Sequence, residues 1–494
     1  MSGARAAAAV SVALAAVASA GAAGRGGEGT ELAVGYASRP ALTHALVAGH
    51  ATLVRDIGAL RVAQVRGDAR TLRSQPGVRF VEPVAPRASE AEPAAAYATA
   101  AAAEWQLRAT HTDAVPDAVL RAAANIAIAV IDTGADLTAP DLAAKTPLVW
   151  NTRTATPDVR DPNGHGTFVA SLAAGSVTND DGMSGSGGDA RLMIVKSGSD
   201  GGSFTDVDEA AGITWAVDHG ARVINLSVGG PTTSATERRA VQYAIDHGAL
   251  VVAPVGNEYE AGNPVEYPAA LLQPVGSGGV GGAGLAVTAS TVEGRRASFA
   301  NTGSWVSLAA PGDHVLGAVS SASSTVTYPR STLTGAKSGL YGYGSGTSFA
   351  APQVAGAAAL VWAANPALTA QEVAQILKET ASGRGRWTTD LGFGVVDAAA
   401  AVARAQQGLR GVGVLLGGRL VKNLVKLNWS GPASGYTLAV TVDGRTVRTL
   451  IPNSEKTAAA VGVTKGHSYA FTVSALDANG VTTAISSPAT FVVR

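Results

Sequence analysis

The stretch Asn125-Ile-Ala-Ile-Ala-Val-Ile-Asp-Thr-Gly134 places an unbroken apolar run directly before an aspartate and a Thr-Gly turn. A short apolar run bounded by turn residues is typical of a β-strand buried on both faces. Comparable runs follow at residues 192–195, 223–228, 250–255 and 285–289, and helix-like stretches lie between them, as at 207–218 and 235–246. This alternation predicts an α/β fold over residues 105–405, with a mostly parallel sheet and helices on both faces. Catalytic groups in such folds lie at the carboxyl ends of the strands.

The segments before this core differ from it in composition. Residues 1–22 combine Arg5, an alanine-rich apolar run and the sequence Ala18-Ser-Ala20, which together predict a secretory signal and a secreted, extracellular protein. An alanine-rich tail without this role is the alternative. Residues 30–87 are mixed in composition. Residues 88–104 are mostly alanine with acidic and proline breaks, as expected of an exposed linker.

The tail over residues 415–494 has a different pattern. Its short runs alternate apolar and polar residues, as in 436–442, 469–475 and 489–493, and turn sequences such as Asp443-Gly444 separate them. Alternation with a period of two predicts half-buried strands, so the tail is expected to form a β-sandwich.

The overall composition excludes several classes of protein. Thirty-seven basic and 37 acidic residues balance to zero, so the chain lacks the basic footprint of a nucleic-acid binder. Without cysteine it cannot use disulfides, a thiolate nucleophile or a zinc–thiolate site. After the signal, no apolar stretch reaches the ~20 residues of a membrane span, and residues 354–364 fit a buried helix better.

Asp132 is the first candidate catalytic residue, because a carboxylate at the end of a buried strand can be held rigidly. Taken alone, Asp-Thr-Gly also occurs in aspartic proteases, which need two carboxylates that share one proton. This chain has one Asp-Thr-Gly and no Asp-Ser-Gly, which disfavours that interpretation.

Three further motifs carry polar groups suited to acyl transfer. His165 is bracketed by glycines in Gly164-His-Gly-Thr-Phe, so its imidazole is uncrowded, and an apolar helix is expected to follow. Ser348 lies in Gly346-Thr-Ser-Phe-Ala-Ala-Pro352, where a small turn delivers a hydroxyl to the start of a long helix. Asn257 follows the apolar run 250–255 and offers an amide donor; an ordinary turn is the alternative for an Asn there.

Asp-Thr-Gly, His-Gly-Thr, Gly-Asn and Gly-Thr-Ser-x-Ala-x-Pro, in this order over residues 105–405, resemble the subtilisin (subtilase) family of serine peptidases. The order contradicts an α/β-hydrolase, in which the serine comes first. The resemblance implies that Ser348 is the nucleophile, His165 the general base and Asp132 the residue that orients it. It implies that Asn257 stabilises the oxyanion and that no cofactor is required.

The same resemblance assigns substrate contacts. Ser227, Val228 and Gly229 match the strand edge that pairs with an extended substrate backbone, and Asp200, Gly201 and Gly202 match the opposite wall. Tyr267 matches one wall of the specificity pocket, and the other runs from Pro254 to Gly256. Glu266, where relatives often carry glycine, is hypothesised to narrow this pocket or to favour a basic residue before the scissile bond. The alternative is that it points to solvent.

A structural calcium ion is a further expectation from the resemblance. Asp141 follows Pro140, and Asn179 lies in the acidic loop 178–182, which suits a hard cation that prefers oxygen ligands. Ala139 replaces the usual histidine and the run 185–188 is unusually rich in glycine, so a solvated acidic turn is the alternative.

Residues 30–87 resemble the inhibitory propeptide of these enzymes through the run Val78–Pro83, which implies a small α+β unit, with cleavage expected between about 84 and 104. A small separate domain without an inhibitory role is the alternative. The tail resembles a fibronectin type III module through Trp429 and its Tyr-x-Phe-x-Val run. The sequence thus predicts a monomeric, autoprocessed endopeptidase with protein or peptide substrates and its own propeptide as inhibitor. The alternatives are a catalytically inactive binding protein and a dedicated processing protease.

Overall fold

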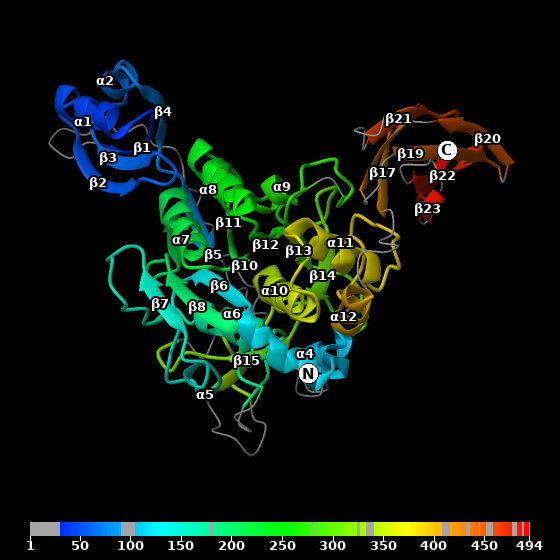
Figure 1. Ribbon diagram of the computed structural model, residues 1–494, viewed down its shortest axis with the longest axis horizontal. Helices are drawn as coiled ribbons and strands as arrows, with labels where there is room; N and C mark the ends of the chain where they lie inside the picture. The colour runs from blue at the N-terminus through cyan, green and yellow to red at the C-terminus, as the bar shows by residue number, and fades with distance from the viewer. Residues whose placement is uncertain are drawn as a thin grey trace, which may run out of the picture.

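The computed structural model describes residues 30–89, 104–177, 182–280, 282–323, 327–331, 340–407, 415–430, 435–443, 445–450, 458–476, 482–486 and 489–493. Three units follow one another along the chain, coloured from blue to red in Figure 1. The predicted signal and most of the predicted linker lie outside the described residues.

The N-terminal unit is a four-stranded antiparallel sheet with two helices. Its elements are β1 (Glu31–Tyr36), α1 (Arg39–Ala48), β2 (Thr52–Ile57), β3 (Val62–Arg66), α2 (Ala69–Arg73) and β4 (Val78–Pro83), with strand order β2-β3-β1-β4. Leu32, Val34 and Leu72 belong to its own core. Ala33, Ile57 and Val62 instead share a core with two helices of the central unit, so this unit is docked by one apolar face (Figure 1).

The central unit is built on a seven-stranded parallel sheet of order β14-β13-β12-β10-β6-β8-β7. The strands are β6 (Ala127–Asp132), β7 (Leu148–Asn151), β8 (Arg191–Lys196), β10 (Val223–Leu226), β12 (Leu250–Pro254), β13 (Leu285–Ser290) and β14 (Leu308–Pro311). All five predicted strands are present, which confirms the predicted α/β class. The two edge strands, β7 and β14, were not predicted.

Helices cover both faces of this sheet. On one face, α6 (His165–Ala174) and α10 (Thr347–Ala364) pack against Ile128 and Val130. On the other face, α7 (Asp206–Asp218) and α8 (Ala235–Asp246) pack against Ala129 and Ile131. Alternate residues of β6 thus enter different cores, as the period of a strand requires. The other α-helices of this unit are α3 (Trp105–Ala109), α4 (Asp117–Ala122), α5 (Pro140–Ala143), α9 (Ala269–Leu272), α11 (Ala370–Thr380) and α12 (Ala398–Gln406). Two further strands, β15 (Val315–Ala318) and β16 (Tyr341–Gly344), form an antiparallel pair.

The central helix α10 is buried along most of its length, including Val354 to Trp362, as predicted for this segment. Within the described ranges, no helix combines the length and the apolar character needed to cross a membrane.

The C-terminal unit consists of two antiparallel sheets around one core. One sheet contains β17 (Leu415–Val421), β18 (Leu424–Ser430) and β21 (Ala458–Gly462). The other contains β19 (Gly435–Val442), β20 (Arg445–Leu450), β22 (His467–Leu476), β23 (Thr482–Ile485) and β24 (Ala489–Val493). Trp429, Tyr436 and Phe471 fill the space between them, in agreement with the predicted β-sandwich.

Candidate active site

Asp132 and His165 form a buried pair at the carboxyl edge of the parallel sheet. Asp132 ends β6, His165 begins α6, and Asp132 Oδ1 lies 2.7 Å from His165 Nδ1. The two residues are 0% and 1% exposed, so the hydrogen bond is shielded from water. A carboxylate on Nδ1 fixes the tautomer and leaves Nε2 as the nitrogen that can exchange a proton with a substrate group.

The positions on either side of His165 require glycine, because of the backbone conformation at one and the lack of space for a side chain at the other. Gly164 has a φ of 92°, which favours glycine, at the start of α6. A Cβ on Gly166 would lie 2.2 Å from the carbonyl oxygen of Gly134 and 3.1 Å from Cβ of Asp132. Two loops therefore approach each other backbone to backbone, and this approach sets the short distance between the carboxylate and the imidazole.

Asp161 is a supporting residue that the sequence analysis missed. Its Oδ1 accepts hydrogen bonds from Thr133 Oγ1 (2.8 Å) and Gly164 N (3.0 Å), and its Oδ2 accepts from Thr167 N (2.8 Å). This one buried carboxylate ties the turn after β6 to the first turn of α6. Its position in Arg160-Asp-Pro-Asn-Gly, an ordinary turn sequence, gave no sign of this role.

Ser348 is the second residue of α10 and is fully buried. Its Oγ lies 3.5 Å from the carbonyl oxygen of Ser227, and its own carbonyl accepts a 2.8 Å hydrogen bond from Ser227 Oγ. The ring of the next residue, Phe349, lies 5.8 Å from the imidazole of His165, centroid to centroid. The start of α10 thus lies against both the histidine and the strand that follows β10.

Asn257 lies just beyond β12 and beside the residue that precedes Ser348. Its Oδ1 accepts hydrogen bonds from Thr347 N and Thr347 Oγ1, both at 2.9 Å. These two bonds fix the carboxamide against the first turn of α10. They commit its oxygen as an acceptor at the start of α10.

The two predicted substrate walls enclose a strand of the protein's own chain. β5 (Pro86–Ser89) lies between β11 (Val228–Gly229) and β9 (Ser203–Thr205) in a three-stranded antiparallel sheet. Val228 pairs with Ser89, Gly229 pairs with Ala88, and the carbonyl of Gly202 accepts a hydrogen bond from Ser89 N (3.2 Å). The strand extends two residues into the segment that the composition assigns to a linker.

The N-terminal unit also caps two helices of the central unit. The carboxylate of Glu82 accepts hydrogen bonds from Ala235 N (3.1 Å) and Thr236 N (3.0 Å) at the start of α8. At the start of α7, Asp206 N donates a 2.9 Å hydrogen bond to the carbonyl of Ala85, and Asp206 Oδ1 accepts one from Ala85 N (2.9 Å). Negative charge at a helix N-terminus is stabilising, so the contact with α8 holds the strand that leads into the cleft.

Glu266 is buried beside the predicted specificity pocket. It is 6% exposed, so the alternative that it points to solvent is wrong. A Cβ on Gly256 would lie 2.8 Å from Cγ of Glu266 and 2.7 Å from Glu258 Oε2, which places both glutamates against this wall. Burial, with a smaller contribution from the charge of Glu258, raises the pKa of Glu266 to about 7. The neighbouring Tyr267 is bound through its backbone to Gly230, directly after β11 (2.9 and 3.0 Å).

The other predicted residues lie in two places. Asp200 is exposed and pairs with Lys196 at 3.0 Å, and Gly201 and Gly202 continue the same loop. Asp141 is buried, and its Oδ2 accepts hydrogen bonds from the hydroxyl of Tyr341 (2.8 Å) and from Met183 N (3.3 Å).

The surroundings of Asp141 bear on the expected calcium site. The charge of Asp141 contributes to a raised pKa of Glu104, chiefly a consequence of burial, which places two carboxyl groups near each other. Asn179 lies outside the described residues. Among the described residues there is no group of three or more His, Cys, Asp or Glu side chains suited to a metal ion.

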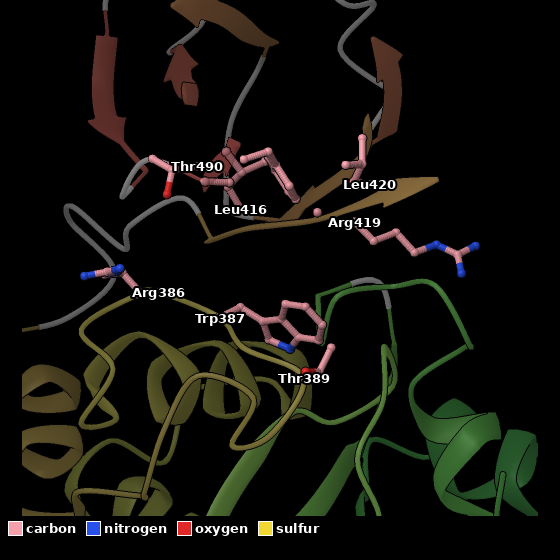
Figure 2. Close-up of a pocket in the computed structure, with 11 residues that line it drawn as sticks. Arg386, Trp387, Thr389, Leu416, Arg419, Leu420 and Thr490 are labelled. Atoms are coloured by element: carbon pink, nitrogen blue, oxygen red, sulfur yellow. The ribbon is translucent and has the colours of Figure 1, made fainter. Parts of the chain in front are cut away.

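A separate cavity of about 390 Å³ lies between the central and C-terminal units. Figure 2 shows Arg386, Trp387 and Thr389 on one side, and Leu416, Leu420 and Thr490 on the other. Next to it, Asn428 Nδ2 donates to the carbonyl of Gly276 (2.8 Å). Among the predicted site residues that the structure describes, none lines this cavity, so it is distinct from the candidate active site.

Comparison with known proteins identifies the family. Residues 123–395 match the Subtilase family (Peptidase_S8). The chain belongs to the subtilase family. A thermophilic serine proteinase of Bacillus sp. (strain AK1) is 33% identical over 66% of this chain and 74% of its own length. Thermitase of Thermoactinomyces vulgaris is 34% identical over 53% of this chain and 83% of its own.

The fold also agrees with a solved structure. The solved structure is that of fervidolysin from Fervidobacterium pennivorans, described as a keratinolytic enzyme related to subtilisin. It has a TM-score of 0.66 at 20% sequence identity, and the match covers 92% of this chain and 88% of the fervidolysin chain. With the family match and the related proteinases, the chain is a subtilisin-like serine endopeptidase.

Proposed function

We propose that this subtilase hydrolyses peptide bonds through an acyl-enzyme, with Asp132, His165 and Ser348 as its triad, and that it is made as a secreted, autoprocessed zymogen. The observation that carries the proposal is the buried 2.7 Å contact between Asp132 and His165, beside the helix start that bears Ser348. The intact Asp, His and Ser disfavour a binding protein without activity.

The chemistry follows from the role of each group. Ser348 attacks the scissile carbonyl while His165 Nε2 accepts its proton, and the same nitrogen later returns a proton to the leaving amine. Asp132 holds the imidazole and stabilises the imidazolium that forms in between. The Nδ2 amide of Asn257 and the backbone N–H of Ser348, at the N-terminus of α10, stabilise the oxyanion.

The zymogen proposal is supported by β5, because an extended strand between two edge strands has the geometry of a bound peptide substrate. The scissile bond is then expected after Ser89, where β5 ends, and before Trp105, whose Nε1 donates to the carbonyl of His314 in the central unit (3.1 Å). This range narrows the expected cleavage site to residues 89–104.

Mass spectrometry of the purified wild-type chain beside Ser348→Ala tests this proposal. We expect the wild type to lose residues up to a point between 89 and 104, and the variant to keep them. Labelling by a fluorophosphonate probe should occur at Ser348 in the matured wild type only. A wild type that matures but is not labelled, or a variant that matures equally well, would contradict the assignment.

Two narrower roles belong to the same proposal. An ionised Glu266 at the pocket wall would favour a basic residue before the scissile bond. Cleavage of a peptide library by Glu266→Gly beside the wild type tests this. If both enzymes prefer the same residue before the scissile bond, the hypothesis is wrong. Digestion of casein distinguishes a general endopeptidase from a dedicated processing protease.

The remaining expectations concern the tail, calcium and assembly. We propose that the C-terminal unit is a fibronectin type III-like module and that the protein is a monomer without nucleic-acid partners. A calcium ion would be held by oxygen ligands of Asp141 and Asn179.

A further inference from the structure

The side chain of Arg87, the cation of β5, is completely buried against the central unit. The side chain of Arg87 is 0% exposed, whereas its neighbours Pro86 and Ala88 are exposed. Arg87 Nη2 lies 3.1 Å from Glu237 Oε1, Nε lies 3.6 Å from Glu209 Oε2, and Nη1 donates to the carbonyl of Pro86 (3.0 Å). The guanidinium is thus surrounded on several sides although the backbone that carries it lies at the surface.

The pocket around Arg87 is acidic and belongs to the central unit. Glu209 lies in the first turns of α7, Glu237 lies in the first turn of α8, and Asp206 is the first residue of α7. All three are at most 1% exposed. Burial and the charge of Glu237 raise the pKa of Glu209, and the positive charge of Arg87 acts in the opposite direction. The N-termini of α7 and α8 favour negative charge at this point.

These carboxylates differ from the other acidic contact between the two units. Asp208 pairs with Arg55 of the N-terminal unit at 3.0 Å and also with Arg153 of the central unit at 2.7 Å, so it keeps a cation when the N-terminal unit leaves. Among the described residues, Arg87 is the only cation within salt-bridge distance of Glu209 or Glu237. Departure of β5 would leave a buried, electronegative pocket beside the substrate groove without its cation.

We propose that Asp206, Glu209 and Glu237 form a specificity subsite that selects an arginine side chain of the substrate. This proposal rests on the proposed function, in which substrates replace β5 between β9 and β11. Arginine fits better than lysine because its planar group can face several partners at once, here two glutamates of different helices at 3.1 and 3.6 Å. Loss of one partner from a buried ion pair is costly, which makes such a pocket selective.

The register of β5 gives the position of the selected arginine. Arg87 pairs with Phe204, and Ser89, two residues further on, pairs with Val228 next to Ser227, whose carbonyl contacts Ser348 Oγ. The chain therefore runs from Arg87 towards the nucleophile. Because β5 ends at Ser89, a substrate strand in this register that is cut after the position of Ser89, or after the next residue, carries the arginine as the third or fourth residue before the cut.

Cleavage of a proteome-derived peptide library by the matured enzyme tests the subsite. We expect arginine to be enriched at the third or fourth residue before the cut. In matched peptides built on the best-cleaved library sequence, replacement of this arginine by methionine should lower kcat/KM on the order of 10²-fold, and lysine should fall between them. A library that is cut without this enrichment overturns the subsite, whereas a library that is not cut at all overturns the proposed peptidase function.

A variant of the enzyme provides the second readout. In the double variant Glu209→Leu/Glu237→Leu, kcat/KM for the arginine peptide divided by kcat/KM for the methionine peptide should fall to about one or below. Because both values are measured on the same enzyme, this ratio does not depend on the amount of active protein. Asp208→Asn is the matched control, since it removes a neighbouring carboxylate of α7 that has its own arginine, and it should keep the ratio. If the double variant also keeps the ratio, the proposal is wrong.

Discussion

The carboxyl group of Glu266 should cost the folded protein stability in a way that depends on pH. Its pKa of about 7 lies above the ordinary value of 4.5, chiefly because of burial. As pH rises from 4.5, the unfolded chain releases this proton before the folded chain does, so the free energy of unfolding falls until about pH 7 and is then constant. At about 1.4 kcal/mol per pH unit, the difference between the two pKa values corresponds to roughly 3 kcal/mol. Because water partly screens the carboxylate, we expect the change in the free energy of unfolding to be about 2 kcal/mol.

Glu266→Gln removes the titration and should therefore stabilise the protein at alkaline pH only. We expect the free energy of unfolding to equal that of the parent within about 0.5 kcal/mol at pH 4.5 and to exceed it by about 2 kcal/mol at pH 8. Urea unfolding monitored by tryptophan fluorescence measures both, with Ser348→Ala as the parent to prevent self-digestion.

The pH dependence of the free energy of unfolding distinguishes titration of Glu266 from a packing effect. Glu260→Gln is the matched control, because Glu260 is an exposed glutamate two residues beyond Glu258 and should change stability by less than about 0.5 kcal/mol at either pH. A difference between Glu266→Gln and its parent that is the same at pH 4.5 and pH 8 would refute the reasoning, since a packing effect does not titrate.

Three further outcomes follow from the described contacts. Asp132→Asn should lower kcat by about 10⁴-fold while the fold persists, because the amide can no longer hold the imidazole in the working tautomer; circular dichroism checks the fold and peptide hydrolysis checks the loss. Glu82→Gln should weaken docking of the N-terminal unit by about 1–2 kcal/mol, since α8 loses a charge at its N-terminus, and faster hydrogen exchange in β1 and β4 of the Ser348→Ala parent would report it. If calcium binds at Asp141, EDTA should lower Tm, because an ion that binds only the folded state stabilises it; an unchanged Tm would remove the site.

The parallel sheet could be predicted because its central strands are buried on both faces. Each of these strands is a run of apolar residues between turn residues, and hydrophobic pattern alone marks it. The edge strand β7 has one exposed and two half-buried residues in Leu148-Val-Trp-Asn, so no such run exists. The edge strand β14, Leu308-Ala-Ala-Pro, is buried but only four residues long and ends in proline, which a strand pattern disfavours.

The predicted reactive residues share a property that made them visible in the sequence. Asp132 ends a strand, and His165 and Ser348 lie in the first turns of helices; small residues that allow close approach accompany each of them. Asp161 and Arg87 have no such context. Arg87 lies between proline and alanine at the edge of an alanine-rich stretch, and its role depends on Glu209 and Glu237, which lie far along the chain. A tertiary partner of this kind leaves no local pattern.

Four helices of the central unit begin at the same edge of the sheet, and this arrangement connects the reaction with its selectivity. The starts of α6 and α10 carry His165 and Ser348, and the starts of α7 and α8 carry the acidic pocket. Helix N-termini stabilise a developing oxyanion and a buried carboxylate for the same electrostatic reason. Acidic residues can therefore be placed in the first turns of α7 and α8 at a lower cost than elsewhere in the core. A fold that already directs positive helix ends at the substrate groove can acquire a preference for a cationic substrate side chain with a few substitutions in these turns, without a change to the catalytic pair.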